Sequence, residues 1–554
     1  MNTNSNGAAP RGQLSLAGLL VGAIGCVIIT ASSAYTALKM GALPWPTIFT
    51  SLTALVCLRA LGKTSVADAT ITQVIMSAGS MVAGGLVFTV PAIWILGERT
   101  PSPWVLLAVT LAGTLLGLVA TALIRRRFID ESDLEYPIGV AAAETLKVGS
   151  AGAGAGVRLF VSMGLSGLWC ICRDVLALMP VVAFQLPVPG VAFGLYNSPM
   201  LVSVGFLLGV VPAIFWLVGA LLVNVGLPLV AQVTGFTDPA QASVWASSLG
   251  MGLMMGSGVG VILKDIVPSV WRSMRSRSTA RTASAADDAA LRRRFSSRDR
   301  ILLSSLAICA AALLVFALKL NPLVLVAAVV LTFIASIMSA QSVGSTGIDP
   351  MEVFAGLVAV LCAGLVVTGH VELLLIAAAA AIACGLAGDV MSDFKTGALL
   401  DVSPRTLWVA QAVGALLGAA VSVVVILVLF NAFGPQSFGP GKAFVAAQAN
   451  MVAALVGGIP APGFFAAGLA AGVGLYMLGV PAMMIGLGAY LPFYMSATAV
   501  LGALVRLVWE RLGARSSRTP EQREASSTMV ASGVLGGESI VGVVIALVSL
   551  FAGM

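Results

Sequence analysis

Long runs without a charged residue alternate with short polar segments along the whole chain. Such runs lie at 14–38, 40–58, 69–97, 103–124, 239–263, 301–318, 320–348, 353–369, 373–388 and 406–441. Two further runs, 175–237 and 443–505, are too long for one helix and are expected to hold two or three spans or re-entrant pieces each. Because one span needs about 20 apolar residues, the pattern predicts roughly 14–16 membrane segments.

Composition agrees with this pattern. Of the 554 residues, 59% are hydrophobic and only 10% are charged, whereas soluble domains carry about 25% charged residues. The alternation of a β-barrel is missing from the apolar runs, so the predicted fold is an all-α polytopic integral membrane protein. The net charge of +7 comes from basic residues gathered in short polar segments. It therefore predicts a membrane orientation, not a nucleic-acid partner.

Basic segments predict which ends of the helices face the cytoplasm. Arg125–Arg127 and the segments 264–300 and 506–523 are rich in arginine, so we place them and the N-terminus inside. Lys39 then falls outside, as an exception to the rule. The predicted division of the chain is a cytoplasmic tail 1–13, a first transmembrane half 14–263, a basic linker 264–300, a second half 301–505, a basic cytoplasmic loop 506–528 and a terminal span 529–554.

An internal repeat supports the division into two halves. The stretch "SAYTALKMGALP" (Ser33–Pro44) and the stretch "SAQSVGSTGIDP" (Ser339–Pro350) share the pattern S-A-x6-G-x2-P. The stretches "PIGVAAAETL" (Pro137–Leu146) and "PGKAFVAAQANM" (Pro440–Met451) repeat at a similar offset. Duplicated halves with broken helices at corresponding places are typical of secondary transporters.

The stretch "DVMSDFKTG" places three charges after an uncharged run. Asp389 and Asp393 are four positions apart and share a helix face, where like charges repel and favour protonation of one carboxyl, as a proton carrier requires. Lys395 lies about 200° from Asp393 on a regular helix, so the two pair only if the helix breaks, for which Gly388 and Gly397 are candidates. The alternative is that these charges anchor the end of a span in the membrane interface.

Two other polar clusters are candidate substrate contacts. Glu144 and Lys147 are three positions apart in a short segment that is either a re-entrant helix, whose N-terminus would attract an anion, or an interfacial amphipathic helix. Gln73, Ser77 and Ser80 form a polar stripe on an apolar helix, and helix packing explains such a stripe equally well.

The remaining residues with possible chemical roles, and the motifs that we do not find, argue against several classes of function. Glu538 is a lone acid in the last span, either a proton-coupling group or the structural partner of an arginine. The single histidine, His370, is expected to be a loop or packing residue, and the seven cysteines lie in apolar stretches, so no metal site is predicted. We find no nucleotide-binding loop and no set of nucleophile and base, so neither an ATP-driven pump nor an enzyme is expected.

Several stretches resemble the oligopeptide transporter family, in its bacterial branch, which is related to the yellow-stripe metal-chelate carriers. They are, in chain order, "ITQVIMSAG" and "FTVPAIWILG" (71–97), "YPIGVAAAETLKVG" (136–149), "GSTGIDP" (344–350), "DVMSDFKTGALL" (389–400), "GLGAYLPF" (486–493) and "SGVLGGES" (532–539). The chain departs from the family pattern at Thr70, Val74 and Ile138, where the family usually has asparagine, threonine and an acid.

The resemblance implies proton-coupled import into the cytoplasm. The expected function is a secondary active importer of short peptides or peptide-like compounds in a bacterial inner membrane, with a metal-chelate carrier of the same family as the alternative and a passive channel as a further one. No cofactor is expected beyond the proton gradient, the partners are substrate, protons and lipids, and assembly into a homodimer stays open. The expected substrate contacts are Gln73, Ser77, Glu144, Lys147, Lys395, Thr396 and Tyr490, and the expected proton-coupling residues are Asp389, Asp393 and Glu538.

Overall fold

The structure is a computed structural model. It describes residues 15–41, 46–62, 65–132, 134–149, 155–185, 193–235, 237–268, 297–366, 368–513 and 520–552. Within these ranges eleven helices are long and apolar enough to cross a membrane, and five shorter apolar helices accompany them. The predicted all-α polytopic fold is thereby confirmed, whereas the tail 1–13 and most of the linker 264–300 lie outside the described residues.

The described part of the first half folds into helices, several of which are short. They are α1 (Leu16–Met40), α2 (Pro46–Ala60), α3 (Val66–Val87), α4 (Pro91–Ile95), α5 (Pro103–Arg125), α6 (Pro137–Gly149), α7 (Ala155–Asp174), α8 (Pro199–Leu208), α9 (Val210–Gly219), α10 (Gly226–Thr234) and α11 (Pro239–Val261). The π-helical segments η1 (Arg126–Asp130), η2 (Ala220–Val225) and η3 (Ile262–Ile266) continue α5, α9 and α11. Serine side chains cap several N-termini; the Ser15 hydroxyl, for example, accepts a hydrogen bond from the Gly18 amide at 3.0 Å.

The second half begins with one additional helix. Its elements are α14 (Ser297–Leu318), α15 (Pro322–Thr346), α16 (Met351–Ala363), α17 (His370–Ala387), α18 (Asp389–Leu399), α19 (Pro404–Phe433), η4 (Pro435–Ser437), α20 (Ala447–Gly457), α21 (Pro462–Met477), α22 (Ala482–Tyr490), α23 (Phe493–Gly513) and α24 (Pro520–Ala552). Proline occupies the first turn of α15, α19 and α21, where its missing N–H costs no hydrogen bond.

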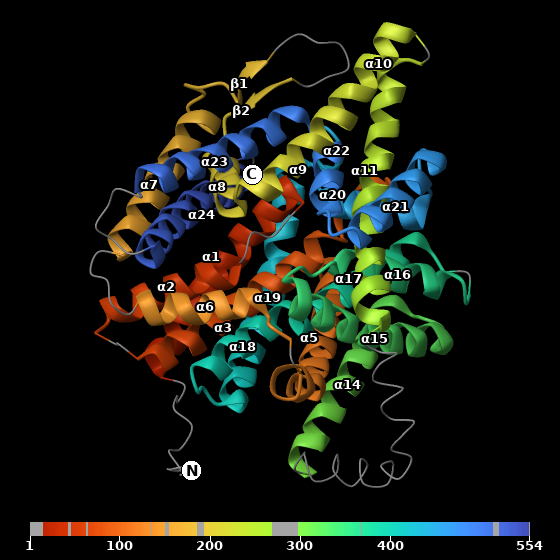
Figure 1. Ribbon diagram of the computed structural model, residues 1–554. Coiled ribbons are helices and arrows are strands. Elements are labelled where there is room, and N and C mark those ends of the chain that lie inside the picture. The colour runs from red at the N-terminus through yellow and green to blue at the C-terminus, as the bar shows by residue number, and fades with distance from the viewer. Residues whose placement is uncertain are drawn as a thin grey trace.

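The two overlong apolar runs are more finely divided than the sequence pattern predicts. The run 443–505 holds the helices α20 to α22 and the start of α23, because glycine or proline follows the end of each of the first three. The run 175–237 holds α8 and the nearly continuous α9, η2 and α10, but it begins with an antiparallel hairpin of β1 (Val182–Gln185) and β2 (Gly194–Tyr196). This hairpin lies at the top of the molecule in Figure 1, at the end opposite to α14.

Contacts between helices repeat from one half to the other. Helix α3 packs on α19 and α17 packs on α5, which are equivalent pairs if α3 corresponds to α17 and α5 to α19. In the same way, α24 packs on α7 and α8, and α11 packs on α21 and α22. The short helix α6 packs on α18, and its counterpart α20 packs on α4. The molecule is therefore built from two cross-packed repeats, with α14 outside the repeat.

Individual hydrogen bonds repeat as well. The Tyr136 amide donates to the Gly344 carbonyl at 3.0 Å just before α6, and the Ala446 amide donates to the Leu38 carbonyl at 2.9 Å just before α20. Both donors have the positive φ angles that are rare outside glycine, 50° for Tyr136 and 44° for Ala446. Leu38 and Gly344 occupy equivalent positions in the two repeat motifs. The same backbone conformation thus precedes the short helix in both copies.

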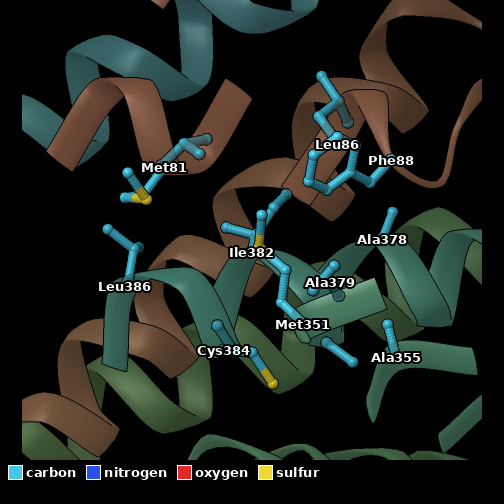
Figure 2. Packing of buried hydrophobic residues seen from close by; sticks show 14 of the residues in the cluster. Met81, Leu86, Phe88, Met351, Ala355, Ala378, Ala379, Ile382, Cys384 and Leu386 are labelled. Atoms are coloured by element: carbon cyan, nitrogen blue, oxygen red, sulfur yellow. The ribbon is translucent and has the colours of Figure 1, made fainter. Parts of the chain in front are cut away.

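The core is centred on α17, which is buried from Leu373 to its end at Ala387. Figure 2 shows Ile382 and Leu386 of α17 facing Met81 and Leu86 of α3. Close approach of backbones is possible because small residues line the contacts: a Cβ added to Gly113 of α5 would lie 2.6 Å from the Ala379 carbonyl oxygen. In a bilayer such close packing is a main source of helix association.

Candidate functional site

The α17–α18 span is broken at Gly388. Helix α17 ends at Ala387 and α18 starts at Asp389, with Gly388 between them at φ −91° and ψ −73°. A Cβ on Gly388 would collide with the Ser339 hydroxyl and would lie 2.8 Å from a carboxylate oxygen of Asp349, so glycine leaves room for both side chains. The predicted break at Gly388 is present, whereas α18 continues through Gly397 to Leu399.

Four carboxyl groups gather around this break. Asp389 lies within electrostatic range of Asp349, Asp393 and Glu352. Asp393 and Glu352 are almost fully buried, and both carboxylate oxygens of Asp349 are shielded from solvent. Asp349 and Glu352 come from the loop between α15 and α16 and from the first turn of α16, so the cluster joins two broken elements of the second half. We call Asp349, Glu352, Asp389 and Asp393 the acidic cluster.

The cluster is poor in positive charge. No described lysine or arginine forms an ion pair with Asp349, Glu352 or Asp389. Charged groups in the membrane interior are costly unless they are paired or hydrogen-bonded, and like charges at close range disfavour simultaneous ionisation. The arrangement therefore favours the binding of protons or of a cationic group.

Asp393 receives a strong hydrogen bond from the other half of the molecule. The side-chain amide of Gln73 on α3 donates to the Asp393 carboxylate at 2.6 Å, and both residues are fully buried. Ser77, one turn further along α3, is also buried, and Ser80 forms a hydrogen bond at 2.8 Å with Ser33 of α1. The polar stripe on α3 thus has two roles, since Gln73 contacts the acidic cluster and Ser80 packs helices together.

Lys395 and Thr396 face α6, away from the acidic cluster. The Lys395 ammonium donates to the Leu134 carbonyl at 3.0 Å, and the Thr396 hydroxyl donates to the Gly139 carbonyl at 2.8 Å. These bonds hold the N-terminal turn of α6 against α18. The Lys395 ammonium is thus bonded to the segment before α6.

A pocket of about 690 Å³ opens where α6 meets α18. Its lining residues are Ser132, Leu134, Glu135, Pro137, Val140, Ala141, Glu144 and Lys395. It therefore brings together two of the predicted substrate contacts, Glu144 and Lys395, and it carries both charge signs. Lys147 lies one turn beyond Glu144 and is exposed.

The repeat-equivalent position, between α4 and α20, holds a cluster of aromatic rings. The ring of Trp94 stacks on Phe430 at 4.5 Å and lies 4.6 Å from Phe438, which in turn stacks on Phe444 at 5.2 Å, all between ring centroids. Two equivalent places in the duplicated fold thus differ, since one is a polar pocket and the other is filled by an aromatic plug of Trp94, Phe430, Phe438 and Phe444.

Glu538 lies in a separate buried network. Its carboxylate forms an ion pair with Arg173 at 2.9 Å and accepts hydrogen bonds from the Ser198 hydroxyl and from the Met200 amide at 2.8 Å, at the N-terminus of α8. Arg173 also pairs with Asp174 at 2.6 Å. The second interpretation of Glu538, as the partner of an arginine, describes this geometry.

The other candidates lie apart from the acidic cluster. Tyr490 ends α22 and packs in an apolar cluster with Met40, Met251 and Met451, so the structure does not bring it to Gln73 or Asp393. His370 is the first residue of α17, where it is exposed and its Nδ1 atom lies 3.2 Å from a Glu98 carboxylate oxygen. Within the described part of the chain, no group of three or more metal-ligating side chains is found.

Comparison with known proteins now assigns the family. A family model described as "OPT oligopeptide transporter protein" matches residues 13–549 of the chain. The chain belongs to this family. The OPT match runs through both repeats and all the elements around the acidic cluster, and the family name indicates a transporter, not an enzyme.

Named relatives point to two kinds of substrate. A Haemophilus influenzae protein named "Putative oligopeptide transporter" is 25% identical, over 93% of this chain and 92% of that protein. A probable metal-nicotianamine transporter of Oryza sativa subsp. japonica is 28% identical over 28% of this chain and 26% of its own length. A metal-nicotianamine transporter of Arabidopsis thaliana is 29% identical over 29% of this chain and 27% of its own.

Asp349 and Glu352 belong to the acidic cluster but are not among the site residues predicted from the sequence. Both stand in or beside "GSTGIDP", one of the stretches that resemble the family, and both are acids in an apolar region. Their separation from Asp389 in sequence hid the fact that they meet it at the break after α17.

Replacing Gln73 by leucine should shift the pH dependence of transport. The amide donor stabilises the ionised form of Asp393, so its loss favours the protonated form. We expect the pH at which uptake is half-maximal to move upward by about one pH unit, which corresponds to about 1.4 kcal/mol for one charge-assisted hydrogen bond. Initial rates of uptake into proteoliposomes across a pH series measure this shift.

Gln411→Leu is the matched control for that experiment. Gln411 is equally buried and donates at 2.9 Å to the Leu386 carbonyl, but not to a carboxylate. Its variant should leave the pH midpoint in place. An equal shift in both variants, or no shift in Gln73→Leu, would contradict the assignment.

Arg173 and Glu538 should behave as a structural pair. Removing one partner leaves a buried charge, at a cost of about 3–5 kcal/mol. Thermal unfolding in detergent is expected to show lower midpoints for Arg173→Met and Glu538→Gln, and partial recovery in the double variant. Glu510→Gln, which breaks an exposed pair with Arg506, should cost less than about 1 kcal/mol. If the Glu538→Gln protein is as stable as wild type and has lost only proton coupling, Glu538 is a proton-coupling residue and the structural assignment is contradicted.

Proposed function

We propose that this OPT protein is a secondary active importer that uses the proton gradient to move short peptides or peptide-like compounds into the cell. The observation that carries the proposal is the acidic cluster at the break between α17 and α18. Its carboxyl groups come from two broken elements and one of them is bound by the opposite repeat through Gln73. Such a site changes its charge by binding protons and changes its contacts when it does so.

The coupling step follows from the electrostatics of the cluster. With several carboxylates ionised, mutual repulsion and the apolar surroundings destabilise the site. A proton from the acidic side of the membrane relieves the repulsion and permits the repeats to move around the break at Gly388. Deprotonation on the other side, where the α6–α18 pocket opens, restores the repulsion. Transport and proton movement are linked because the same carboxyl groups favour different arrangements in the two protonation states.

The pocket between α6 and α18 suits a zwitterion. A peptide carries an amine at one end and a carboxylate at the other, and the lining of this pocket offers Glu144 and Lys395. Because Lys395 lies two positions after Asp393 on α18, a substrate in the pocket is next to the helix that carries the proton site. We infer that the pocket is the release path toward the cytoplasm.

A metal-chelate substrate is the second candidate. The plant relatives named as metal-nicotianamine transporters match a segment of the chain. A chelate brings its own ligands, so a carrier for it needs polar and charged contacts but no metal site of its own. The same charge pair in the pocket would serve it.

The location and direction of transport rest on the basic segments. We propose insertion in a bacterial inner membrane with the ends of α5 and α11 in the cytoplasm, because arginines follow both helices. A passive channel fits less well, since the aromatic plug blocks the repeat-equivalent of the open pocket. A homodimer stays a prediction from the sequence.

Uptake into proteoliposomes tests the proposed function. With an acidic exterior, a pool of di- to hexapeptides should accumulate, and a protonophore should abolish the accumulation. Asp393→Asn should lower the proton-driven rate about tenfold or more. A typical coupling between two sites changes affinity about 5–150-fold. Asp401→Asn is the control, because Asp401 is exposed beyond the end of α18 with a φ angle of 55°, which asparagine adopts readily.

A ferric chelate offered in parallel separates the two candidates. Uptake of the chelate alone would identify a metal-chelate carrier. A leak of both substrates without a pH gradient would overturn the carrier mechanism, and unchanged proton-driven uptake in Asp393→Asn would overturn the role of the acidic cluster.

A further inference from the structure

A lysine in the last turn of α1 is surrounded by aromatic rings. The Nζ atom of Lys39 lies 5.8 Å from the ring centroid of Tyr35, 5.9 Å from that of Tyr196 and 5.4 Å from that of Phe444. It also donates a hydrogen bond to the Tyr196 hydroxyl at 3.3 Å. Cations within about 6 Å of an aromatic face are attracted to it. We call Lys39 with these three rings the lysine box.

Acids near the lysine box are already engaged. Asp174 and Glu538 both pair with Arg173, and Glu538 accepts two further kinds of donor at the start of α8. Lys39 forms no ion pair with a carboxylate in the described part of the chain. An ammonium has three N–H donors, and the bond to Tyr196 uses one. Lys39 as a whole residue is half-buried.

The lysine box lies directly against the aromatic plug. Phe444 belongs to both, since its ring stacks on Phe438 and meets Tyr35 edge to face at 5.7 Å. Helix α1, strand β2 and the segment before α20 each contribute one of its rings, so both repeats build it. Lys39 and the aromatic plug therefore share one ring.

The two repeat motifs differ in charge at this point. In the alignment of Ser33–Pro44 with Ser339–Pro350, Lys39 corresponds to Ser345, and the acid Asp349 corresponds to Leu43. One repeat motif thus carries a cation and the other an acid of the acidic cluster. Repeat-related motifs with opposite charge are suited to the two ends of a dipolar substrate.

We propose that Lys39 binds a carboxylate of the transported compound on the side of the aromatic plug, with the rings of Tyr35 and Phe444 packing against the group that carries it. The inference rests on the proposed function and adds the ligand chemistry of a second site. A terminal carboxylate of a peptide and a carboxylate of an organic chelator share this chemistry. The bound anion would accept the remaining hydrogen bonds of the ammonium.

Uptake kinetics with matched substrates test the proposal. Proteoliposomes with wild type, Lys39→Gln and Lys39→Arg are offered trialanine, trialanine amide and ferric citrate under an acid-outside gradient. For wild type we expect the KM of trialanine to be about tenfold lower than that of the amide, the value of one charged hydrogen bond. Lys39→Gln should remove this difference by raising the KM of the free acid only, and Lys39→Arg should retain most of it. An equal effect on ferric citrate would show that chelator carboxylates use the same site.

Lys264→Gln is the matched control, because Lys264 also lies over a tyrosine ring, 5.6 Å from the centroid of Tyr476, at the far end of α11. It should leave the discrimination unchanged. If Lys39→Gln lowers uptake of acid and amide in parallel, the role of Lys39 is structural and the proposal is overturned.

A binding measurement separates this proposal from the proposed function. Trialanine and ferric citrate should each raise the thermal unfolding midpoint of purified wild type, whereas trialanine amide should raise it less, and Lys39→Gln should abolish the difference. If wild type transports none of these compounds but binds carboxylates through Lys39, the site stands and the proposed transport function falls. The site is overturned if carboxylates stabilise wild type and Lys39→Gln to the same extent. It is also overturned if they stabilise neither protein.

Discussion

The hydrogen bond from Gln73 to Asp393 is the contact on which the rest of the structure depends. It lies between α3 and α18, in the repeat-related spans that form the centre of the molecule, and both groups are fully buried. A buried carboxylate needs either a donor or a proton. Gln73 supplies the donor, and the three neighbouring acids make a proton favourable. At the break, Asp389 lies within electrostatic range of the other three acids, and glycine at position 388 leaves space for the side chains of Ser339 and Asp349. In the proposed mechanism, the place where the span is interrupted is also the place that binds the proton.

Duplication explains how one site can serve two sides of a membrane. The repeats are cross-packed, and equivalent hydrogen bonds before α6 and α20 turn both short helices inward. At one of the two equivalent places there is a pocket with Glu144 and Lys395, and at the other there is the aromatic plug. A duplicated fold has no reason to differ at equivalent places unless it can exchange the two arrangements or needs each for a different task. The buried pair of Arg173 and Glu538, with the bond from the Met200 amide to Glu538, links α7, α8 and α24.

Much of this architecture can be predicted from the sequence, and the features that cannot be predicted have physical reasons. Helical spans, the repeat motif, the break at Gly388 and the common face of Asp389 and Asp393 follow from composition and spacing, which act locally. The hairpin before α8 was not predicted, because an apolar segment of β-branched residues interrupted by prolines has no helical or strand period to read. The meeting of Asp349 with Asp389 depends on long-range packing. Lys39 stood out only as an exception in the charge pattern, since its aromatic partners come from three distant segments.

Proton movement during substrate entry tests the central claim most directly. Vesicles containing the protein and an internal pH dye would receive a peptide gradient with no imposed pH gradient. The account predicts that peptide entry acidifies the lumen and that Asp349→Asn, which alters the acidic cluster without touching the α6–α18 pocket, abolishes the acidification. Peptide entry with no change in internal pH, or acidification that persists unchanged in Asp349→Asn, would contradict it.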